Sequence, residues 1–335
     1  MKKSNKVVLL AIGMLVFTIG FGDCLAAMEK PKPPEGYPKR KIESIVPWGA
    51  GGGSDRFARH FVKTVKKHLG LDIVVTNHPG AGGVTGVNYY MGLPADGYSI
   101  VTMSDIIIVH NLLGHIKYAV DDFAHIARIT HDVDVLSISP DNKKFSDVKG
   151  MIKWAKKHPK FLTVAVEGYG GIGDLECTGF ENVAGYTAVH VPYSKLGPRV
   201  AAVIGGHIDV LWEQAGDILP YVQGGKLKPI VSFSKERMPR APYNVVPCSV
   251  ELGYNFIQGH WRSIGFKKGT DPKIVKYMTQ VVEYYMNTPE AKELQKKHFL
   301  DLRPAFLGGE ALEKWLRDEK ASFKDSLETL GILKK

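Results

Sequence analysis

The sequence has no apolar run long enough to cross a bilayer as a helix. Its longest early uncharged stretch, residues 7–22, has 16 residues, whereas a membrane-spanning helix needs roughly 20. Later apolar runs are interrupted by charges or glycines within about 10 residues. Three lysines precede residues 7–22 and small residues 25–27 follow, which is the pattern of a secretory signal peptide. We expect cleavage after Ala26 or Ala27, so that 1–27 is a signal peptide and the mature protein is periplasmic; a retained N-terminal anchor is the alternative.

Cysteine is also scarce. Of the three cysteines, Cys24 lies in the segment expected to be removed, which leaves Cys177 and Cys248. An oxidising compartment would permit a disulfide between them. Two buried free thiols are the alternative, and the sequence does not decide between them.

The motifs of several enzyme classes are missing. The 12 histidines are dispersed, with no His-Glu-x-x-His pattern and no pairing with cysteines. There is no Gly-x-Ser-x-Gly elbow and no Gly-Lys-Ser/Thr ending of a phosphate-binding loop. We therefore expect no catalytic residues, no metal and no cofactor, and a protein that is not an enzyme.

The net charge is positive, but the basic residues are scattered along the sequence. The net charge is +10 at pH 7, yet no basic block with interleaved aromatic residues occurs, so nucleic acid is not the expected partner. A mild preference for anionic ligands follows from the excess of Lys and Arg.

Strands and helices alternate along the chain, which predicts an α/β fold with mostly parallel, doubly wound sheets covered by helices. Apolar residues recur at helical spacing over 54–69 and Gly70 follows, which predicts a helix over 54–69 with Ser54 as its N-cap. About 65 C-terminal residues are expected to be helical and to pack on an earlier domain. The expected strands are 41–47, 72–76, 98–103, 162–166, 188–192, 209–213 and 228–233, and further helices are expected at 148–157, 174–183, 198–204 and 218–223.

Two stretches, 133–140 and 257–266, are suited to carry the chain between two domains. Two crossings make the first domain discontinuous, which is the hinged plan of periplasmic binding proteins. We expect lobe 1 to contain 28–137 and 259–335, and lobe 2 to contain 138–258.

The first candidate site is the glycine-rich loop 47–55, which leaves a predicted strand and opens onto a predicted helix. Closely spaced glycines let the backbone approach a ligand, and a helix N-terminus offers N–H groups to an anion. A flexible turn without a ligand is the alternative. The candidate ligand contacts here are Trp48, Ala50, Gly51, Gly52, Ser54 and Asp55.

A second glycine-rich loop, 168–174, also follows a predicted strand and opens a helix. Its spacing fits Gly-x-Gly-x-x-Gly, so the alternative function is an exported dinucleotide-dependent oxidoreductase that uses the Gly168–Gly173 loop. No carboxylate stands at the end of the following strand to hold a ribose, and a glycine-rich counterpart exists in the other half. We therefore favour a second ligand-gripping loop. Its candidate contacts are Tyr169, Gly170, Gly171, Ile172, Gly173 and Asp174.

The remaining candidates are single side chains. Ser104 ends a predicted strand, where it offers a hydroxyl or caps a helix, and Glu213 ends another strand. Trp261 and Arg262 lie on the returning crossing and offer a stacking face and a counter-charge. Residues 77–83 are expected to form a structural turn.

These motifs together resemble the solute receptors of tripartite tricarboxylate transporters, the TctC or Bug family. The matching segments span almost the whole mature chain and are PWGAGGGSD (47–55), NHPGAGG (77–83), PADGYSI (94–100), HVPY (190–193), IGGHIDVLWEQ (204–214) and GGKLKPI (224–230). The resemblance implies a Venus-flytrap fold that closes on an organic acid and then docks on membrane transporter subunits. We expect a monomer whose ligand is a small carboxylate.

Carried over to this chain, the resemblance places Ala50, Gly51, Gly52 and Asp55 on one side of the carboxylate and 170–174 on the other. Relatives often have serine or threonine where this chain has Gly171 and Gly173. Here the side-chain hydroxyl contacts with the ligand would be lost, and only backbone contacts would remain. Asp105, Asp174 and Glu213 add negative charge near the expected cleft. That charge favours a monocarboxylate with an amine or hydroxyls, or an aromatic acid stacked on Trp48, Tyr169 or Trp212.

Overall fold

A computed structural model describes residues 28–168, 171–329 and 332–333 of the chain. The predicted signal peptide, residues 1–27, lies outside the described residues. Within the described ranges, no helix combines the length and the apolar character that a bilayer crossing requires.

The first structural unit, which we call lobe 1, is built on a six-stranded sheet with the strand order β11-β4-β10-β3-β1-β2. β1 pairs in parallel with β2 and β3, whereas β10 pairs antiparallel with β3 and β4, and β11 pairs antiparallel with β4. Its strands are β1 (Ile42–Val46), β2 (Ile73–Asn77), β3 (Ser99–Ser104), β4 (Phe123–His131), β10 (Trp261–Lys267) and β11 (Leu307–Gly308), and its helices are α2 (Gly53–Leu69), α3 (Val84–Met91), α4 (Asp105–Leu112), α9 (Pro272–Asn287), α10 (Pro289–Lys297) and α11 (Gly309–Thr329).

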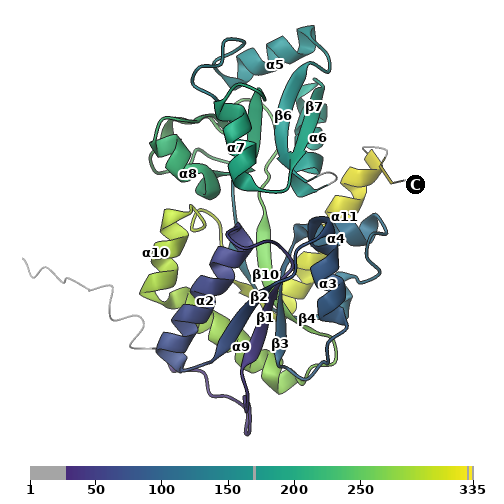
Figure 1. Ribbon diagram of the computed structural model, residues 1–335, viewed down its shortest axis with the longest axis vertical. Coiled ribbons are helices and arrows are strands. Elements are labelled where there is room, and N and C mark those ends of the chain that lie inside the picture. Colours follow the sequence, from purple (N-terminus) through teal and green to yellow (C-terminus); the bar gives the residue numbers. More distant parts are fainter. Residues whose placement is uncertain (1–27, 169–170, 330–331, 334–335) are drawn as a thin grey trace, which may run out of the picture.

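The second unit, lobe 2, is built on a five-stranded sheet with the order β7-β6-β8-β5-β9. Figure 1 shows the two lobes one above the other, joined at a narrow waist. The strands are β5 (Asp134–Ile138), β6 (Leu162–Glu167), β7 (Ala188–Tyr193), β8 (Val210–Gln214) and β9 (Lys228–Ser232), and the helices are α5 (Val148–Lys157), α6 (Ile172–Ala184), α7 (Leu196–Ile204) and α8 (Ala215–Gln223).

Each lobe has its own apolar core, as expected of separate domains. Phe61, Phe266 and Tyr285 belong to the core between the lobe 1 sheet and helices α2 and α9. In lobe 2, Phe180 and Phe233 meet edge to face with ring centroids 4.9 Å apart. The two cores confirm the predicted two-lobed α/β architecture.

The chain crosses between the sheets at Asp132 and Val133, and it returns through the residues that precede β10. The Asp132 N–H donates to the His260 carbonyl over 2.7 Å, so the two crossings are hydrogen-bonded to each other. The predicted crossing segment 133–140 begins at Val133, next to Asp132, and the predicted segment 257–266 contains His260. β5 lies in the lobe 2 sheet, although the sequence assigned residues 134–137 to lobe 1, so the first crossing occurs earlier than expected.

The sheets are mixed and not mostly parallel, which corrects the prediction. β5 pairs antiparallel with β8 and β9, and β10 pairs antiparallel with β3 and β4. The reason is topological: β5 and β10 enter their sheets from the opposite lobe, so they run against the strands of the βα units. Only strands connected by helical crossovers within one lobe are parallel.

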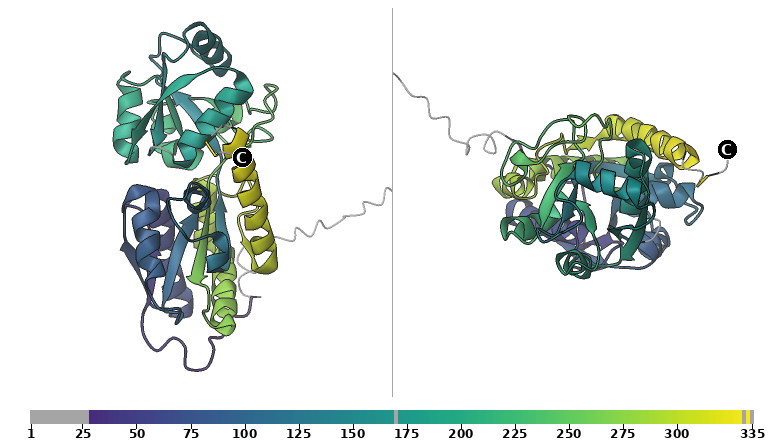
Figure 2. Two further views of the ribbon diagram at one scale, coloured as in Figure 1. Left: turned by 90° about the vertical axis from the view of Figure 1, so that its right-hand side faces the viewer. Right: turned by 90° about the horizontal axis from the view of Figure 1, so that it is seen from above.

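Most of the C-terminal region packs on lobe 1, as predicted, and adds the short strand β11 to its sheet, whereas Phe299 packs in a core cluster of lobe 2. α11 contacts β4 and α4, and Figure 2 shows it running along lobe 1 toward the junction with lobe 2. Cys177 and Cys248 are both buried and free. The alternative of two free thiols is therefore confirmed, and no disulfide joins these two cysteines.

Candidate ligand-binding site

The conformation of the loop between β1 and α2 is fixed by the carboxylate of Asp55, which belongs to the same lobe. The Gly51 N–H donates to Asp55 Oδ2 over 2.9 Å, and Arg59 Nε donates to both carboxylate oxygens over 3.0 Å. Burial opposes ionisation, but the hydrogen bonds from Arg59 and Gly51 lower the pKa of Asp55 below its usual value. Asp55 therefore positions the loop, and its oxygens are occupied inside lobe 1.

Helix α2 begins one residue earlier than predicted. Its N-cap is Gly52, in an extended conformation and without a side-chain cap. Ser54, the predicted N-cap, lies inside the first turn, and its hydroxyl accepts a hydrogen bond from Arg262 Nε over 3.1 Å. Because no side chain caps the helix, its first backbone N–H groups are available to another acceptor.

Residues 77–83 support Trp48, in line with their predicted structural role. Trp48 Nε1 donates to the Gly82 carbonyl over 3.2 Å, and Asn77 Nδ2 donates to the Trp48 carbonyl over 2.9 Å. Gly83 has a φ of 106°, and a Cβ there would lie 3.0 Å from Trp48 Nε1. Glycine at this position therefore lets the indole lie against the turn.

The second glycine-rich loop leads into α6, whose N-cap Gly171 also lacks a side-chain cap. Tyr169 and Gly170 lie outside the described residues. Ile172 is buried against Ile106 and Val109 of α4, and Trp48 packs on the same cluster. This cluster contains residues of both lobes, so the two glycine-rich loops border the same junction.

The acidic residues expected to make the cleft negative are each paired with a basic group. Asp174 contacts His190, and Asp105 lies 3.1 Å from His260 Nδ1. Glu213 forms a buried ion pair with Arg199. Each of these carboxylates therefore has a basic partner in the fold, so it contributes less negative charge to the cleft than the sequence alone predicts.

The Glu213 carboxylate and its partner Arg199 are both deeply buried. Burial raises the pKa of Glu213 to about 7, although the Arg199 guanidinium opposes that shift. Both side chains are 3% exposed. Glu213 therefore belongs to the interior of lobe 2 and is not exposed toward the junction.

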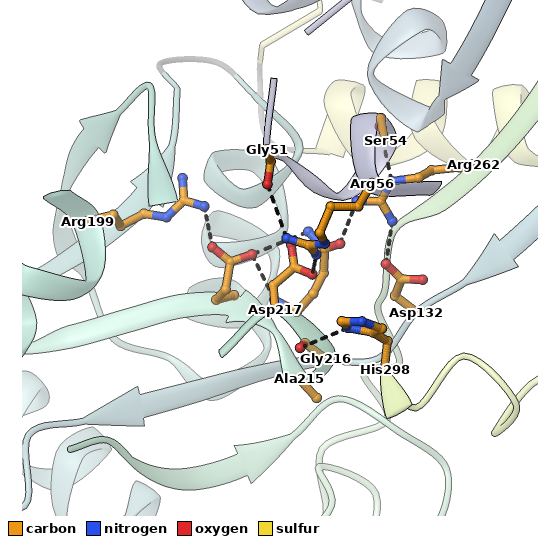
Figure 3. A network of polar contacts seen from close by, with 12 residues as sticks. Gly51, Ser54, Arg56, Asp132, Arg199, Ala215, Gly216, Asp217, Arg262 and His298 are labelled. Atoms are coloured by element: carbon orange, nitrogen blue, oxygen red, sulfur yellow. Dashed lines mark hydrogen bonds and ion pairs between the residues drawn. The ribbon is translucent and has the colours of Figure 1, made fainter. Parts of the chain in front are cut away.

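Arg262 joins both lobes and the hinge through three hydrogen bonds (Figure 3). It donates to Ser54 Oγ of lobe 1, to Asp132 Oδ2 of the first crossing over 2.5 Å, and to Gln214 Oε1 of lobe 2 over 2.7 Å. Arg262 is buried, and the charge that the sequence offered as a counter-charge for a ligand is paired with Asp132. These partners are too far apart in the sequence to be recognised as a group.

A second cross-lobe contact was also missed. Arg56, in the first turn of α2, forms an ion pair with Asp217 of α8 and donates to the Gly51 carbonyl over 3.2 Å (Figure 3). Arg56 and Asp217 line a cavity of about 30 Å³ between the lobes, which is large enough for one or two water molecules. The first glycine-rich loop is thus tied to lobe 2.

Two tryptophans considered as ligand contacts lie inside the lobes. Trp261 is 3% exposed and meets Trp315 edge to face at 5.2 Å. Trp212 stacks on Phe233 at 4.3 Å in the lobe 2 core. Neither ring presents a face to the junction. Ser104 occupies the N-cap position of α4, but its hydroxyl makes no cap hydrogen bond.

Comparison with known proteins agrees with this architecture. Residues 57–332 match the tripartite tricarboxylate transporter family receptor model, TctC. The chain belongs to this family. The TctC family consists of solute-binding receptors and not of enzymes, so the dinucleotide-dependent oxidoreductase finds no support in it.

Individual TctC relatives cover most of the chain. BugT of Bordetella pertussis is 30% identical over 266 residues, which are 78% of this chain and 81% of BugT. A TctC solute-binding protein from Polaromonas is 27% identical with a TM-score of 0.69, over 88% of this chain and 99% of that one. MatC from Rhodopseudomonas palustris, with bound malate, has the same fold: its TM-score is 0.75 at 22% identity, over 87% of this chain and 100% of MatC.

Proposed function

We propose that this TctC-type receptor captures a small organic carboxylate between its lobes in the periplasm, after removal of residues 1–27, and delivers it as a monomer to a tripartite membrane transporter. The observation that carries the proposal is the pair of uncapped helix N-termini, one in each lobe. α2 begins at Gly52 and α6 at Gly171, and neither has a side-chain cap.

Uncapped N-termini suit a carboxylate for two reasons. Their first N–H groups lack partners within the helix, and the helix dipole places partial positive charge at that end. Residues 49–52 are exposed, so their backbone is accessible. A carboxylate between the two helices would accept hydrogen bonds from the first turns of both. We include Trp48, Ala50, Gly51 and Gly52 on one side of the ligand, and 171–173 on the other.

The charge balance at the junction supports a fully ionised acid. The carboxylates of Asp55, Asp105, Asp174 and Glu213 are each paired with a basic side chain, so they do not repel an anion as strongly as free carboxylates would. MatC, which shares the fold, was solved with malate. We therefore propose a small dicarboxylate as the preferred ligand class, ahead of an amino-bearing or aromatic acid.

Closure of the lobes would couple capture to delivery. Ile172 packs on α4 of the opposite lobe, and Arg56 pairs with Asp217. A ligand that bridges the lobes favours the closed arrangement by its differential affinity for that state. The membrane subunits would then recognise the closed surface.

A thermal-shift assay on residues 28–335 tests the ligand class. Succinate, malate, adipate, citrate, benzoate and several amino acids are compared at equal concentration. A ligand at about 100 times its Kd stabilises the folded state by about 2.7 kcal/mol, which corresponds to a rise of roughly 5–10 °C in Tm. We expect such a rise with at least one dicarboxylate. A panel that leaves Tm unchanged would refute the proposal.

A variant at Gly52 tests the binding loop itself. Gly52 has a φ of −73° and a Cβ would lie 3.6 Å from the Gly49 carbonyl, so Gly52→Leu should fold normally but obstruct the helix N-terminus. Gly197→Leu, at an exposed position with open space around the Cβ, is the matched control. Only Gly52→Leu should lose the ligand-induced shift. Delivery is tested separately, by ligand uptake into proteoliposomes that contain tripartite transporter subunits, with and without the receptor.

A further inference from the structure

A buried group of side chains beside the hinge has no part in the proposed carboxylate site. Asp134 begins β5, Glu176 lies in α6, and His260 directly precedes β10. One potential ligand atom from each of the three lies within 4.8 Å of the other two. Asp134 is fully buried and Glu176 is 5% exposed, while the His260 side chain is 12% exposed. Imidazole and carboxylate groups so close together are the usual ligands of divalent metal ions.

The imidazole is already oriented by a carboxylate of lobe 1. Asp105 approaches His260 Nδ1 to 3.1 Å, so in the proposed site the other ring nitrogen, Nε2, would bind the ion. A carboxylate on the far nitrogen of a metal-binding histidine fixes its tautomer and raises its basicity. Asp105 is itself held in place, because its Oδ1 accepts the Ile106 N–H over 2.9 Å.

The two carboxylates are oriented by one indole. Trp212 Nε1 donates to Asp134 Oδ2 and to Glu176 Oε2, each over 3.2 Å. The other oxygen of Asp134, Oδ1, is buried and has no hydrogen-bond partner among the described residues. A buried carboxylate oxygen without a partner is costly, and a cation is the partner that its chemistry calls for.

The local charge also calls for a cation. Asp105, Asp134 and Glu176 place three carboxyl groups around the single imidazole of His260. The nearby Arg303 donates to the carbonyls of Phe233 and Gln258 over 3.0 and 3.1 Å. A divalent ion between the carboxylates would remove their mutual repulsion.

We propose that Asp134, Glu176 and His260 bind one divalent first-row transition-metal ion of the Zn²⁺ and Co²⁺ type, with Asp105 and Trp212 as positioning residues. One nitrogen and two carboxylate oxygens suit these ions, and water would complete the coordination. The site joins α6 and β5 of lobe 2 to the returning crossing, so a bound ion would fasten lobe 2 to the hinge. This proposal is independent of the proposed carboxylate ligand.

A second cluster provides an internal comparison. Cys177, Glu181 and His190 also bring potential ligand atoms within 4.8 Å. However, the two ring nitrogens of His190 already contact Asp174 and Glu181. No imidazole nitrogen is left there for a metal, so we do not assign an ion to it.

Metal binding is measured on residues 28–335 after treatment with EDTA and dialysis. Zn²⁺, Co²⁺ and Mg²⁺ are added separately, bound metal is counted by mass spectrometry, and Co²⁺ is also followed by its visible absorption. We expect one Zn²⁺ or Co²⁺ per chain and no Mg²⁺. Glu176→Gln keeps the side-chain shape and should lower the affinity at least tenfold, and Asp105→Asn should lower it about 10- to 100-fold. Cys177→Ser should bind as the wild type does.

Several results would overturn the assignment. These are the absence of bound Zn²⁺ and Co²⁺, equal binding of Mg²⁺, affinity unchanged by Glu176→Gln, or loss of binding in Cys177→Ser. If Glu176→Gln fails to fold, Asp105→Asn decides the question, and unchanged affinity in that variant overturns the assignment. Carboxylate-induced shifts in Tm are recorded in EDTA, so failure of the metal site and failure of the carboxylate site are distinguishable.

Discussion

Replacing Arg262 with methionine should destabilise the protein more than any exposed arginine substitution. The methionine has a similar length but removes hydrogen bonds to Ser54, Asp132 and Gln214. The Asp132 side chain is 6% exposed, and its Oδ1 has no hydrogen-bond partner among the described residues. Arg262→Met therefore leaves a buried carboxylate without its counter-charge.

The size of the effect follows from the burial of the pair. Removing one partner of a buried ion pair costs about 3–5 kcal/mol, which corresponds to a fall of roughly 6–20 °C in Tm for a chain of this size. Urea denaturation followed by circular dichroism measures the loss in unfolding free energy. The matched control is Arg237→Met. Arg237 forms a surface pair with Glu251 at 2.6 Å, and its side chain is 49% exposed, so its loss should cost below about 1 kcal/mol.

A double variant separates the effect of losing the counter-charge from the effect of losing packing contacts. Arg262→Met combined with Asp132→Leu removes both charges, so it should be more stable than Arg262→Met alone by about 1–3 kcal/mol. The reasoning is wrong if Arg262→Met costs no more than Arg237→Met, or if the second substitution only adds to the loss.

Three further outcomes are expected. Gly53→Ala should destabilise the protein more than Gly52→Ala in urea denaturation, because a Cβ at Gly53 would lie 2.6 Å from Arg262 Nη2 and one at Gly52 only 3.6 Å from a carbonyl. Cys177 and Cys248 are buried and free, so reduction should leave the mass of the mature chain unchanged, and a thiol reagent should label both only in denaturant. Burial opposes protonation of His190, but Asp174 and the neighbouring groups raise its pKa to about 12. The native state therefore holds a proton that the unfolded state releases near pH 6.5. The stability lost in His190→Gln should accordingly be largest at pH 6 and shrink by at most about 1.4 kcal/mol per pH unit between pH 7 and 9, as measured by denaturation at each pH.

Local signals were sufficient for much of the fold. Helix α5 has the predicted bounds because its start and its amphipathic stripe are both encoded nearby: the Asp147 carboxylate accepts the Gly150 N–H over 2.8 Å and caps the helix. The end of α2 was found for a similar reason, since Gly70 adopts a φ of 70° that favours glycine.

The strand β4 was not predicted, because polar residues hide its apolar pattern. His125, Arg128 and Thr130 are buried along it. Arg128 donates to the Ala305 carbonyl over 3.1 Å and lies 4.4 Å from the centre of the Trp315 ring. Those partners come from the C-terminal region, so nothing near β4 in the sequence indicates that its polar residues can be buried.

The helix N-termini beside the candidate site were predicted from the sequence, whereas the partners of its carboxylates were not, and the two outcomes have one cause. The glycine-rich loops are short segments whose helix N-termini depend only on neighbouring residues. The carboxylates depend on partners at large separations: Glu213 on Arg199, 14 residues away, and Asp105 on His260, 155 residues away. Adding formal charges along the sequence counts the acids without their partners, and so it favoured a ligand with an amine. Once the pairs are formed, the helix N-termini are the groups that favour an anion in the proposed site.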